Sequence, residues 1–367
     1  AFGYKADSPW YGNLSFSGLG GMVSDFTNNG GIYPIPVLVF AAFQLMFAII
    51  TPALISGAIA DRTKFTAWAV FVAVWSTIVY FPVAHWVFAF GNKVGDTVTG
   101  AGFLASKGLE DFAGGTAVHI NAGAAGLALA IILGKRVGWR KESMRPHSLP
   151  LVLLGSGLLW FGWFGFNAGS ALAANGIAGL AFLNTQVATA GALIGWLLVE
   201  KIRNGHPTSL GAASGAVSGL VAITPACAFV APWAAVVIGF FAGIFCALAV
   251  GLKYKFGFDD SLDVVGVHLV GGIWGSLAVG LFGTQVVNSV GVDGLFYGGG
   301  AALLTKQALG VGMVALYSFL VTLVLGFIIE KTIGFRVSRD AEVEGVDLSE
   351  HAETAYETSS SSRGGSF

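Results

Sequence analysis

Residues 232–252 have the sequence PWAAVVIGFFAGIFCALAVGL, in which no side chain is charged. A helix needs about 20 mainly apolar residues to cross the hydrocarbon core of a bilayer, and this stretch is long enough. It also lacks the polar face that a surface helix of a soluble protein would carry. We therefore predict a membrane-spanning helix here.

Eight further apolar stretches have a similar length, and the charged residues lie almost entirely between them. They are residues 35–60, 66–90, 113–134, 149–170, 178–200, 208–225, 262–284 and 305–332. Apolar residues make up 55% of the chain and charged residues 11%, against about 25% charged in a typical soluble domain. Mean hydropathy is +0.75. The sequence predicts an all-α polytopic membrane protein with about nine helices. Its net charge of −1 offers no basic surplus for nucleic acid.

Lysine and arginine are unevenly shared between alternate loops. One side of the predicted membrane receives Arg62, Lys64, Lys135, Arg136, Arg140, Lys141, Arg145, Lys201, Arg203, Lys253, Lys255, Lys331, Arg336 and Arg339. The other side receives only Lys5, Lys93, Lys107 and Lys306. Short cytoplasmic loops carry the excess of positive charge. We therefore expect a protein of the cell membrane, with the N-terminus of this chain outside and the C-terminus in the cytoplasm.

The remaining segments divide the chain into three parts. We expect residues 1–34 to form an external loop, residues 35–335 a transmembrane domain, and residues 336–367 a cytoplasmic tail whose Ser/Gly-rich end is disordered. Residues 1–34 contain no secretory signal pattern. A chain that begins outside with an odd number of helices is interpreted as one that starts part-way through a longer bundle.

The two cysteines, Cys227 and Cys246, both lie in apolar sequence. They could form one disulfide, but their place at lipid depth favours two buried thiols that behave as small apolar side chains.

Two histidines lie inside predicted spans, where an ionisable residue is costly and therefore a candidate for function. Asp111 lies eight residues before His119, and Asp263 lies five residues before His268. The two spans cross in opposite directions, as they would in an inverted repeat with a site at mid-membrane. A neutral imidazole has one donor and one acceptor, which suits a small polar molecule. The alternative, two core histidines bonded within the bundle, stays open. Metal ligation is less favoured, because neither histidine has Cys, Asp or Glu beside it at ligand spacing.

Aromatic residues provide a second clue near the external ends of two spans. Phe43 and Phe47 share one helix face, and Trp163, Phe166 and Ser170 follow one another along another helix. Aromatic rings and a hydroxyl can hold a small cation, with about 0.5–2 kcal/mol from each ring contact. Interfacial anchoring is the alternative for such residues.

Several long motifs in this chain closely resemble those of the ammonium transporter (Amt/Mep/Rh) family, on its bacterial Amt side. They are DFAGGTAVHINAG at 111–123, WFGFNAGSA at 163–171, AFLNT at 181–185, TPACAFV at 224–230 and DVVGVHLVGGIWG at 263–275. The resemblance runs from Phe2 into the tail, with the motifs in the family's order. It implies an inverted-repeat bundle of eleven helices that assembles as a homotrimer, with a pore in each protomer and no cofactor. The family's first two helices have no counterpart here.

The resemblance also implies roles for single residues. His119 and His268 match the paired pore histidines, and Trp163 matches a pore-lining tryptophan. Phe47 and Phe166 match the aromatic gate. Phe43, Phe47, Phe88 and Ser170 match the outer site that recruits ammonium, and Asp111 matches a buried carboxylate that supports this site. Phe88 stands where the family usually has tryptophan, which is a stronger partner for a cation, so external affinity is expected to be lower.

The function expected from these observations is transport of ammonium or ammonia rather than an enzyme reaction. Two alternatives are a sensor built on the same fold, which the short tail disfavours, and an unrelated membrane enzyme or metal transporter that uses the histidines. A PII-type regulatory protein is a further expected partner, and the basic loop 135–145 is compatible with it. The excess of lysine and arginine in cytoplasmic loops already accounts for that charge.

Overall fold

The computed structural model describes residues 8–14, 17–19, 35–94 and 97–356. Within them, eight helices are long and apolar enough to cross a membrane, and a ninth apolar helix is shorter. The eight are Val37–Ile59, Phe65–Phe88, Gly115–Leu133, Leu149–Gly169, Gly176–Asn204, Pro232–Phe256, Val265–Phe282 and Ala302–Thr332, and the ninth is Ser209–Ile223. All nine segments predicted from apolar runs are therefore helical, and their ends differ from the prediction by a few residues.

Several of these spans change their helical geometry along their length. The single-type helices are α1 (Val37–Ile59), α6 (Leu149–Gly169), α7 (Gly176–Asn204), α8 (Ser209–Ile223) and α12 (Ala302–Thr332). The composite spans are α2 (Phe65–Trp75) with η2 (Ser76–Tyr80) and α3 (Phe81–Phe88), η3 (Gly115–Ile120) with α5 (Asn121–Leu133), α9 (Pro232–Ala249) with α10 (Leu252–Phe256), and η4 (Val265–Leu269) with α11 (Val270–Phe282). The elements η2, η3 and η4 are π-helical turns.

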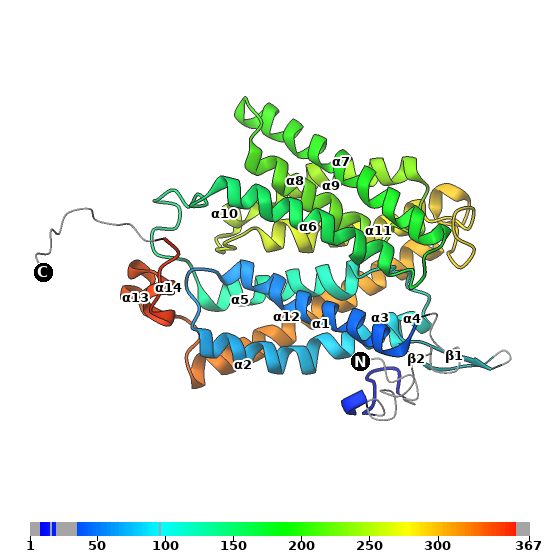
Figure 1. Ribbon diagram of the computed structural model, residues 1–367, viewed down its shortest axis with the longest axis horizontal. Helices are drawn as coiled ribbons and strands as arrows, with labels where there is room; N and C mark the ends of the chain where they lie inside the picture. The colour runs from blue at the N-terminus through cyan, green and yellow to red at the C-terminus, as the bar shows by residue number, and fades with distance from the viewer. Residues whose placement is uncertain (1–7, 15–16, 20–34, 95–96, 357–367) are drawn as a thin grey trace, which may run out of the picture.

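The spans form two adjacent bundles, which lie one above the other in Figure 1. The first contains α1, α2, α3, α5 and α12, with one apolar core around α1, α2 and α5. The second contains α6, α7, α8, α9 and α11, in which α7 packs against α8 and α9. Contacts of η3 with η4, of α5 with η4 and of α11 with α12 join the two bundles. The two histidine-bearing spans therefore meet at the centre of the molecule.

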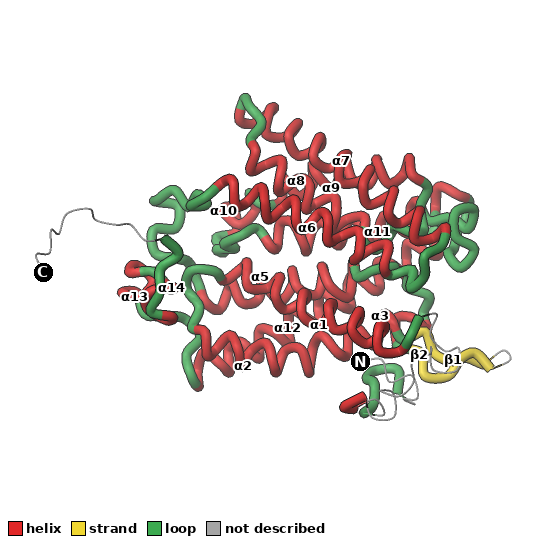
Figure 2. The backbone as a smooth tube through the Cα atoms, in the orientation of Figure 1, coloured by secondary structure: helices red, strands yellow, loops and turns green. Residues whose placement is uncertain are grey.

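Short elements occupy the two ends of the double bundle, as Figure 2 shows. At one end lie the antiparallel hairpin of β1 (Phe90–Val94) and β2 (Thr97–Ala101), α4 (Phe103–Ser106) and η5 (Leu295–Tyr297). At the other end lie α13 (Arg339–Glu344) and α14 (Val346–His351). We call the end with α13 the basic end, because the fourteen lysines and arginines of one set of loops, among them those of loop 134–148, gather there.

Most of the expected N-terminal loop and the Ser/Gly-rich tail end lie outside the described residues. The described part of the first segment includes η1 (Ser17–Leu19) and a stretch that contacts α3. There the Trp86 indole donates a hydrogen bond to the Trp10 carbonyl at 2.8 Å, and the Trp10 ring stacks on Phe103. The tail after α12 stays close to the bundle, because Thr63 and Arg336 form a β-bridge.

Both cysteine thiols are free and fully buried. The prediction of two buried thiols is therefore confirmed, and the alternative of a disulfide is wrong.

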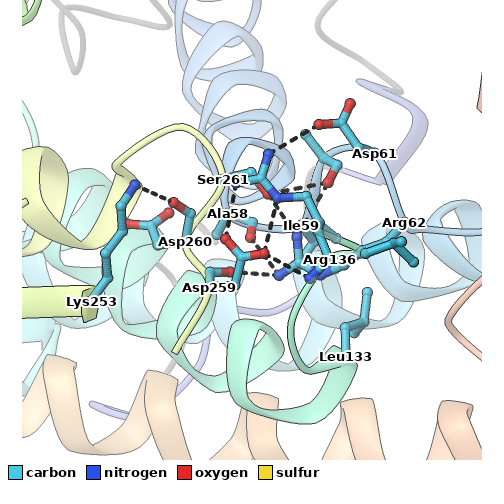
Figure 3. Close-up of polar contacts among 12 residues, drawn as sticks. Ala58, Ile59, Asp61, Arg62, Leu133, Arg136, Lys253, Asp259, Asp260 and Ser261 are labelled. Carbon is cyan, nitrogen blue, oxygen red and sulfur yellow. Dashed lines mark hydrogen bonds and ion pairs between the residues drawn. The ribbon is translucent and has the colours of Figure 1, made fainter. Parts of the chain in front are cut away.

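Arg62 differs from its interpretation as an ordinary charged loop residue. Its side chain is fully buried and donates hydrogen bonds to the Ser261 hydroxyl at 2.7 Å, the Asp259 carbonyl at 2.6 Å and the Ala58 carbonyl at 3.1 Å. Burial lowers the pKa of Arg62 to about 10. Figure 3 shows this guanidinium among the carbonyls and side chains of two loops. Arg62 therefore fixes the end of α1 to the segment that precedes η4.

Candidate functional site

The two histidines are in contact at the junction of the bundles. The Nδ1 atoms of His119 and His268 lie 3.2 Å apart, so one ring donates a hydrogen bond to the other. Their ring centroids are 5.3 Å apart with 22° between the planes. His119 is fully buried and His268 is 8% exposed. The Nε2 atom of His119 has no hydrogen-bond partner within the described residues, which leaves one polar atom at mid-bundle for a small molecule.

Asp111 positions His119 by capping the helix that carries it. Its carboxylate accepts hydrogen bonds from the backbone N–H groups of Gly114, Gly115, Thr116 and Ala117, over 2.7–3.2 Å, and from the Thr116 hydroxyl. The first N–H groups of a helix have no partner within the helix, and a negative charge there is favoured. The carboxylate therefore holds η3 in place, and His119 lies one turn into it rather than the two turns that the predicted span implied.

Asp260, and not Asp263, is the counterpart of Asp111. The Asp260 carboxylate accepts hydrogen bonds from the N–H groups of Val264 at 3.0 Å and Val265 at 2.7 Å, at the start of η4. Asp260 lies eight residues before His268, the same spacing that separates Asp111 from His119. Asp263 instead pairs with Lys253, with 2.7 Å between carboxylate oxygen and Nζ. The interpretation of Asp263 as the matching aspartate is therefore wrong, although the shared spacing was readable in the sequence.

Two glycines allow the histidine-bearing helices to cross closely. Gly123 lies four residues after His119, and a Cβ atom there would lie 2.5 Å from the backbone nitrogen of Leu269. Gly272 lies four residues after His268, and a Cβ atom there would lie 3.0 Å from the Ile120 side chain and 3.2 Å from the His119 Cβ. Each glycine thus faces the residue that follows the other histidine. Small residues permit such close approach between membrane helices.

Aromatic rings continue from the histidines towards the end opposite to the basic end. His119 stacks with Trp163 at 5.3 Å and with Phe166 at 5.8 Å between centroids. The Phe166 ring lies 4.7 Å from Phe47, which in turn lies 4.9 Å from Phe43. These residues come from α1, η3 and α6, so three spans build one continuous aromatic path that ends in the imidazole pair.

Ser170 lies beside this path, whereas Phe88 lies in a different cluster. The Ser170 hydroxyl donates to the Phe166 carbonyl at 2.8 Å, and the Phe43 ring lies 3.1 Å from where a Cβ of Gly169 would be. The structure therefore brings Ser170, Phe43 and Phe166 together. Phe88, at the end of α3, packs against the core that contains Trp86.

The comparisons with known proteins agree with this arrangement of motifs. The model of the Ammonium Transporter Family matches residues 2–356. The chain belongs to this family. It is 59% identical to the ammonium transporter of Mycobacterium bovis over 329 residues, which cover 88% of this chain and 68% of that protein. It is 47% identical to the ammonium transporter of Bacillus subtilis, over 95% of this chain and 82% of that protein.

Solved structures of the ammonium transporter family have the same fold. The crystal structure of Candida albicans Mep2 superposes with a TM-score of 0.82 at 32% identity, over 92% of this chain and 74% of that one. A sensor Amt protein superposes with a TM-score of 0.75 at 32% identity, over 84% of this chain and 75% of that one. The chain is therefore a multi-pass, all-α membrane protein of a transporter family, and the expected resemblance is confirmed.

The sequence did not reveal that charged residues at the basic end help to position the helix of His268. Arg136 binds the Asp259 carboxylate through Nε and Nη2, both at 2.9 Å, and Asp61 through Nη1 at 3.1 Å (Figure 3). Lys253 donates to the Asp260 carbonyl at 2.9 Å. Burial, with repulsion from Asp263, raises the pKa of Asp260 to about 7. An ionic network thus surrounds the aspartate that caps the His268 helix.

Proposed function

We propose that this chain takes up ammonium at the end opposite to the basic end and conducts it as ammonia between the two bundles, past His119 and His268. The observation that carries the proposal is the buried contact between the two imidazoles, in which the Nε2 atom of His119 has no partner within the described residues. Membership of a family of ammonium transporters supplies the substrate.

Conduction as the neutral molecule follows from the cost of desolvation. Transfer of a bare cation into a low-dielectric medium costs on the order of tens of kcal/mol in the Born limit. The rings of Phe47, Phe166 and Trp163, with two imidazoles, do not replace a hydration shell. Ammonium therefore releases its proton near the contact of Phe47 and Phe166, and ammonia crosses. The proton follows separately along the imidazoles, which makes transport electrogenic.

Recruitment of the cation is assigned to the outer end of the aromatic path. The rings of Phe43 and Phe47 offer negative faces, each contributing about 0.5–2 kcal/mol, and the Ser170 oxygen retains acceptor capacity while its hydrogen is donated to Phe166. By resemblance, Phe88 belongs to the recruitment site. It can contribute to cation binding only if the bound cation lies between Phe43 and the cluster that contains Phe88 and Trp86. Asp111 supports the site by holding η3 and does not contact ammonium.

The decisive experiment records ammonium-dependent current in proteoliposomes. The double variant His119→Leu/His268→Leu is expected to lose this current completely, because the passage no longer offers a polar atom or a proton relay. His206→Leu is the matched control, since His206 is an exposed histidine at the basic end, and it should keep the wild-type current. Unchanged current in the double variant would exclude the scheme.

Orientation and assembly are proposed from charge and from family membership. The basic end faces the cytoplasm, by the excess of lysine and arginine there, and the protein assembles as a homotrimer. The apolar surface of α6, where Leu154, Leu158 and Phe161 are exposed, is available for lipid or for a neighbouring protomer. Protease protection of the tail in sealed vesicles tests the orientation, and the mass of the purified complex tests the assembly.

A PII-type regulatory protein is proposed as a partner of the basic end, and the exposed positive charge of loop 134–148 supports a contact with an acidic surface.

The second candidate function is sensing, which the similarity to a sensor Amt protein favours. The two functions separate in one comparison, because a pure sensor would carry no ammonium-dependent current in proteoliposomes.

A further inference from the structure

A cavity of about 420 Å³ opens at the basic end, between the α5–α6 loop and the start of α13. Five cationic side chains line it, and the lining contains no carboxylate. The five are Lys135, Arg136, Lys141, Arg336 and Arg339. They come from two segments that lie some two hundred residues apart in the chain, and the fold alone brings them together. The topology signal requires basic residues on this side of the membrane, but it does not require that they surround one hollow.

Two of the five cations are neutralised and rigidly held. The side chain of Arg136 is 9% exposed and binds Asp259 and Asp61. Arg336 donates to the Leu133 carbonyl at 2.8 Å and pairs with Glu342 at 2.6 Å. These contacts build a fixed floor for the cavity. Two carboxylates border the cavity, since Glu342 also accepts the Val137 N–H at 2.6 Å and the Glu142 carboxylate lies against Gly138. Neither forms an ion pair with Lys135, Lys141 or Arg339 among the described residues.

The other three cations, Lys135, Lys141 and Arg339, are exposed and have no ion-pair partner among the residues that the structure describes. The Lys135 ammonium lies 4.8 Å from the centre of the Trp139 ring, and Trp139 stacks on Tyr254 at 5.9 Å. The wall that carries Lys135 is therefore held by aromatic packing. Three unpaired like charges around one hollow repel one another, and a bound anion would remove that repulsion.

We propose that this cavity binds a phosphate-bearing anion. Several cations that converge on a concave site are the arrangement that phosphate oxygens require. The phosphate could belong to the headgroup of an anionic phospholipid or to a soluble phosphate compound.

A second cavity adjoins the first and suits the lipid source. It measures about 580 Å³, and its lining includes Leu127, Ile131, Phe256 and Phe258. Lys135 lines both cavities. A cationic hollow for a headgroup thus lies beside an apolar one for an acyl chain, with a lysine at their boundary.

Occupancy of the site would reach both histidine-bearing helices. Arg136 binds Asp259, whose neighbour Asp260 caps η4, and Arg336 binds the carbonyl of Leu133 at the end of α5. A ligand held between the loop and the tail would therefore fix the segments from which both helices are positioned. The proposal itself concerns binding and does not depend on what the pore conducts.

Binding is tested on the full chain alone in neutral detergent, so that a PII-type partner is absent. Native mass spectrometry compares dioleoyl phosphatidylglycerol with dioleoyl phosphatidylcholine, which has the same acyl chains and no net charge. Calorimetric titration with pyrophosphate tests the soluble source. The variant Lys135→Gln/Lys141→Gln/Arg339→Gln is expected to lower affinity for the bound probe about tenfold, the effect of three surface charge contacts.

The matched control is Lys201→Gln/Arg203→Gln/Lys331→Gln, which removes three exposed cations from the same end outside the cavity, and its affinity should change less than about twofold. Tight binding of phosphatidylglycerol alone assigns the site to a lipid headgroup, and binding of pyrophosphate assigns it to a soluble phosphate. Binding of neither probe, or an equal loss in the two triple variants, would overturn the proposal. Equal melting temperatures of the variants verify that each is folded.

Discussion

The two histidine-bearing spans have the same local design and different surroundings. In each, an aspartate eight residues before the histidine caps a π-helical turn, and a glycine four residues after it faces the other span. Asp111 is held by four backbone N–H groups and one hydroxyl. Asp260 is held by two backbone N–H groups and lies beside Lys253 and Asp263.

The difference shows that one geometric task, the placement of an imidazole at mid-membrane, is met in two ways. At the Asp111 end, neutral backbone donors satisfy the carboxylate. At the Asp260 end, two backbone donors satisfy the carboxylate, and the buried Lys253 lies beside it, where it bonds the Asp260 carbonyl and the Asp263 carboxylate. The first arrangement should be more sensitive to loss of its capping carboxylate, and in the second the capping carboxylate should itself titrate near neutral pH.

The largest expected effect is the loss of the Asp111 carboxylate. Asp111→Ala leaves four buried N–H groups without an acceptor and is expected to destabilise the protein by more than about 4 kcal/mol, whereas Asp260→Ala, which frees two, should cost about 2 kcal/mol. Apparent melting temperatures in detergent measure both. Asp111→Asn, which keeps one acceptor oxygen, should fall between wild type and Asp111→Ala. Equal losses at the two aspartates would contradict the comparison.

A smaller effect is expected at the crossing glycines. The methyl group of Gly123→Ala would lie 2.5 Å from a backbone nitrogen, whereas that of Gly272→Ala would lie 3.0 Å from a side-chain carbon of Ile120 and 3.1 Å from the Gly115 carbonyl oxygen. A contact at 3.0–3.1 Å is relieved by a shift of a few tenths of an ångström, whereas a contact at 2.5 Å requires the backbone of the other helix to move. We expect a cost of about 3 kcal/mol at position 123 and about 1 kcal/mol at position 272. The reverse order of melting temperatures would show that the two faces are not packed as described.

The smallest expected effect is a dependence of stability on pH at the Asp260 end. Folding raises the pKa of Asp260 from 3.8 to about 7. Between these values the folded state holds a proton that the unfolded state lacks, so the free energy of unfolding falls as pH rises through this window. Asp260→Asn should flatten part of the decline in melting temperature between about pH 4 and about pH 7.

A second carboxyl, Glu110, lies next to Asp111 and should contribute its own pH dependence. Burial raises its pKa from 4.5 to about 7, so Glu110→Gln should remove a separate part of the same decline. A pH profile that neither variant changes would contradict the assignment of the slope to these two carboxyls.

Much of the fold was predictable because membrane spans are encoded locally. Uninterrupted apolar length predicts each helix, and the order of the motifs 111–123 and 263–275 indicated two related spans of opposite direction. His119 and His268 were singled out as ionisable residues inside spans, and Phe47, Phe166 and Trp163 as aromatic residues of two spans. The resemblance added their roles, and their mutual contacts connect spans that are distant in sequence.

Most of what was missed depends on contacts that no spacing encodes. Arg62 was treated as a loop charge, because nothing near it in the chain reveals that Asp259 and Ser261 enclose it. Asp260 was overlooked in favour of Asp263, which is nearer to His268, although the eight-residue spacing was available. The hairpin β1–β2 lies in a segment predicted only as a loop.

The reciprocal seating of Gly123 and Gly272 has a mechanical consequence. The two helices touch through backbone on both sides of the imidazole pair. A rigid-body tilt of one bundle against the other would therefore have to separate these two contacts. Rotation of phenylalanine and imidazole rings does not disturb them. Conduction as proposed would then need only ring motions on a stationary frame, and not the rocking of one bundle against the other that many secondary transporters use.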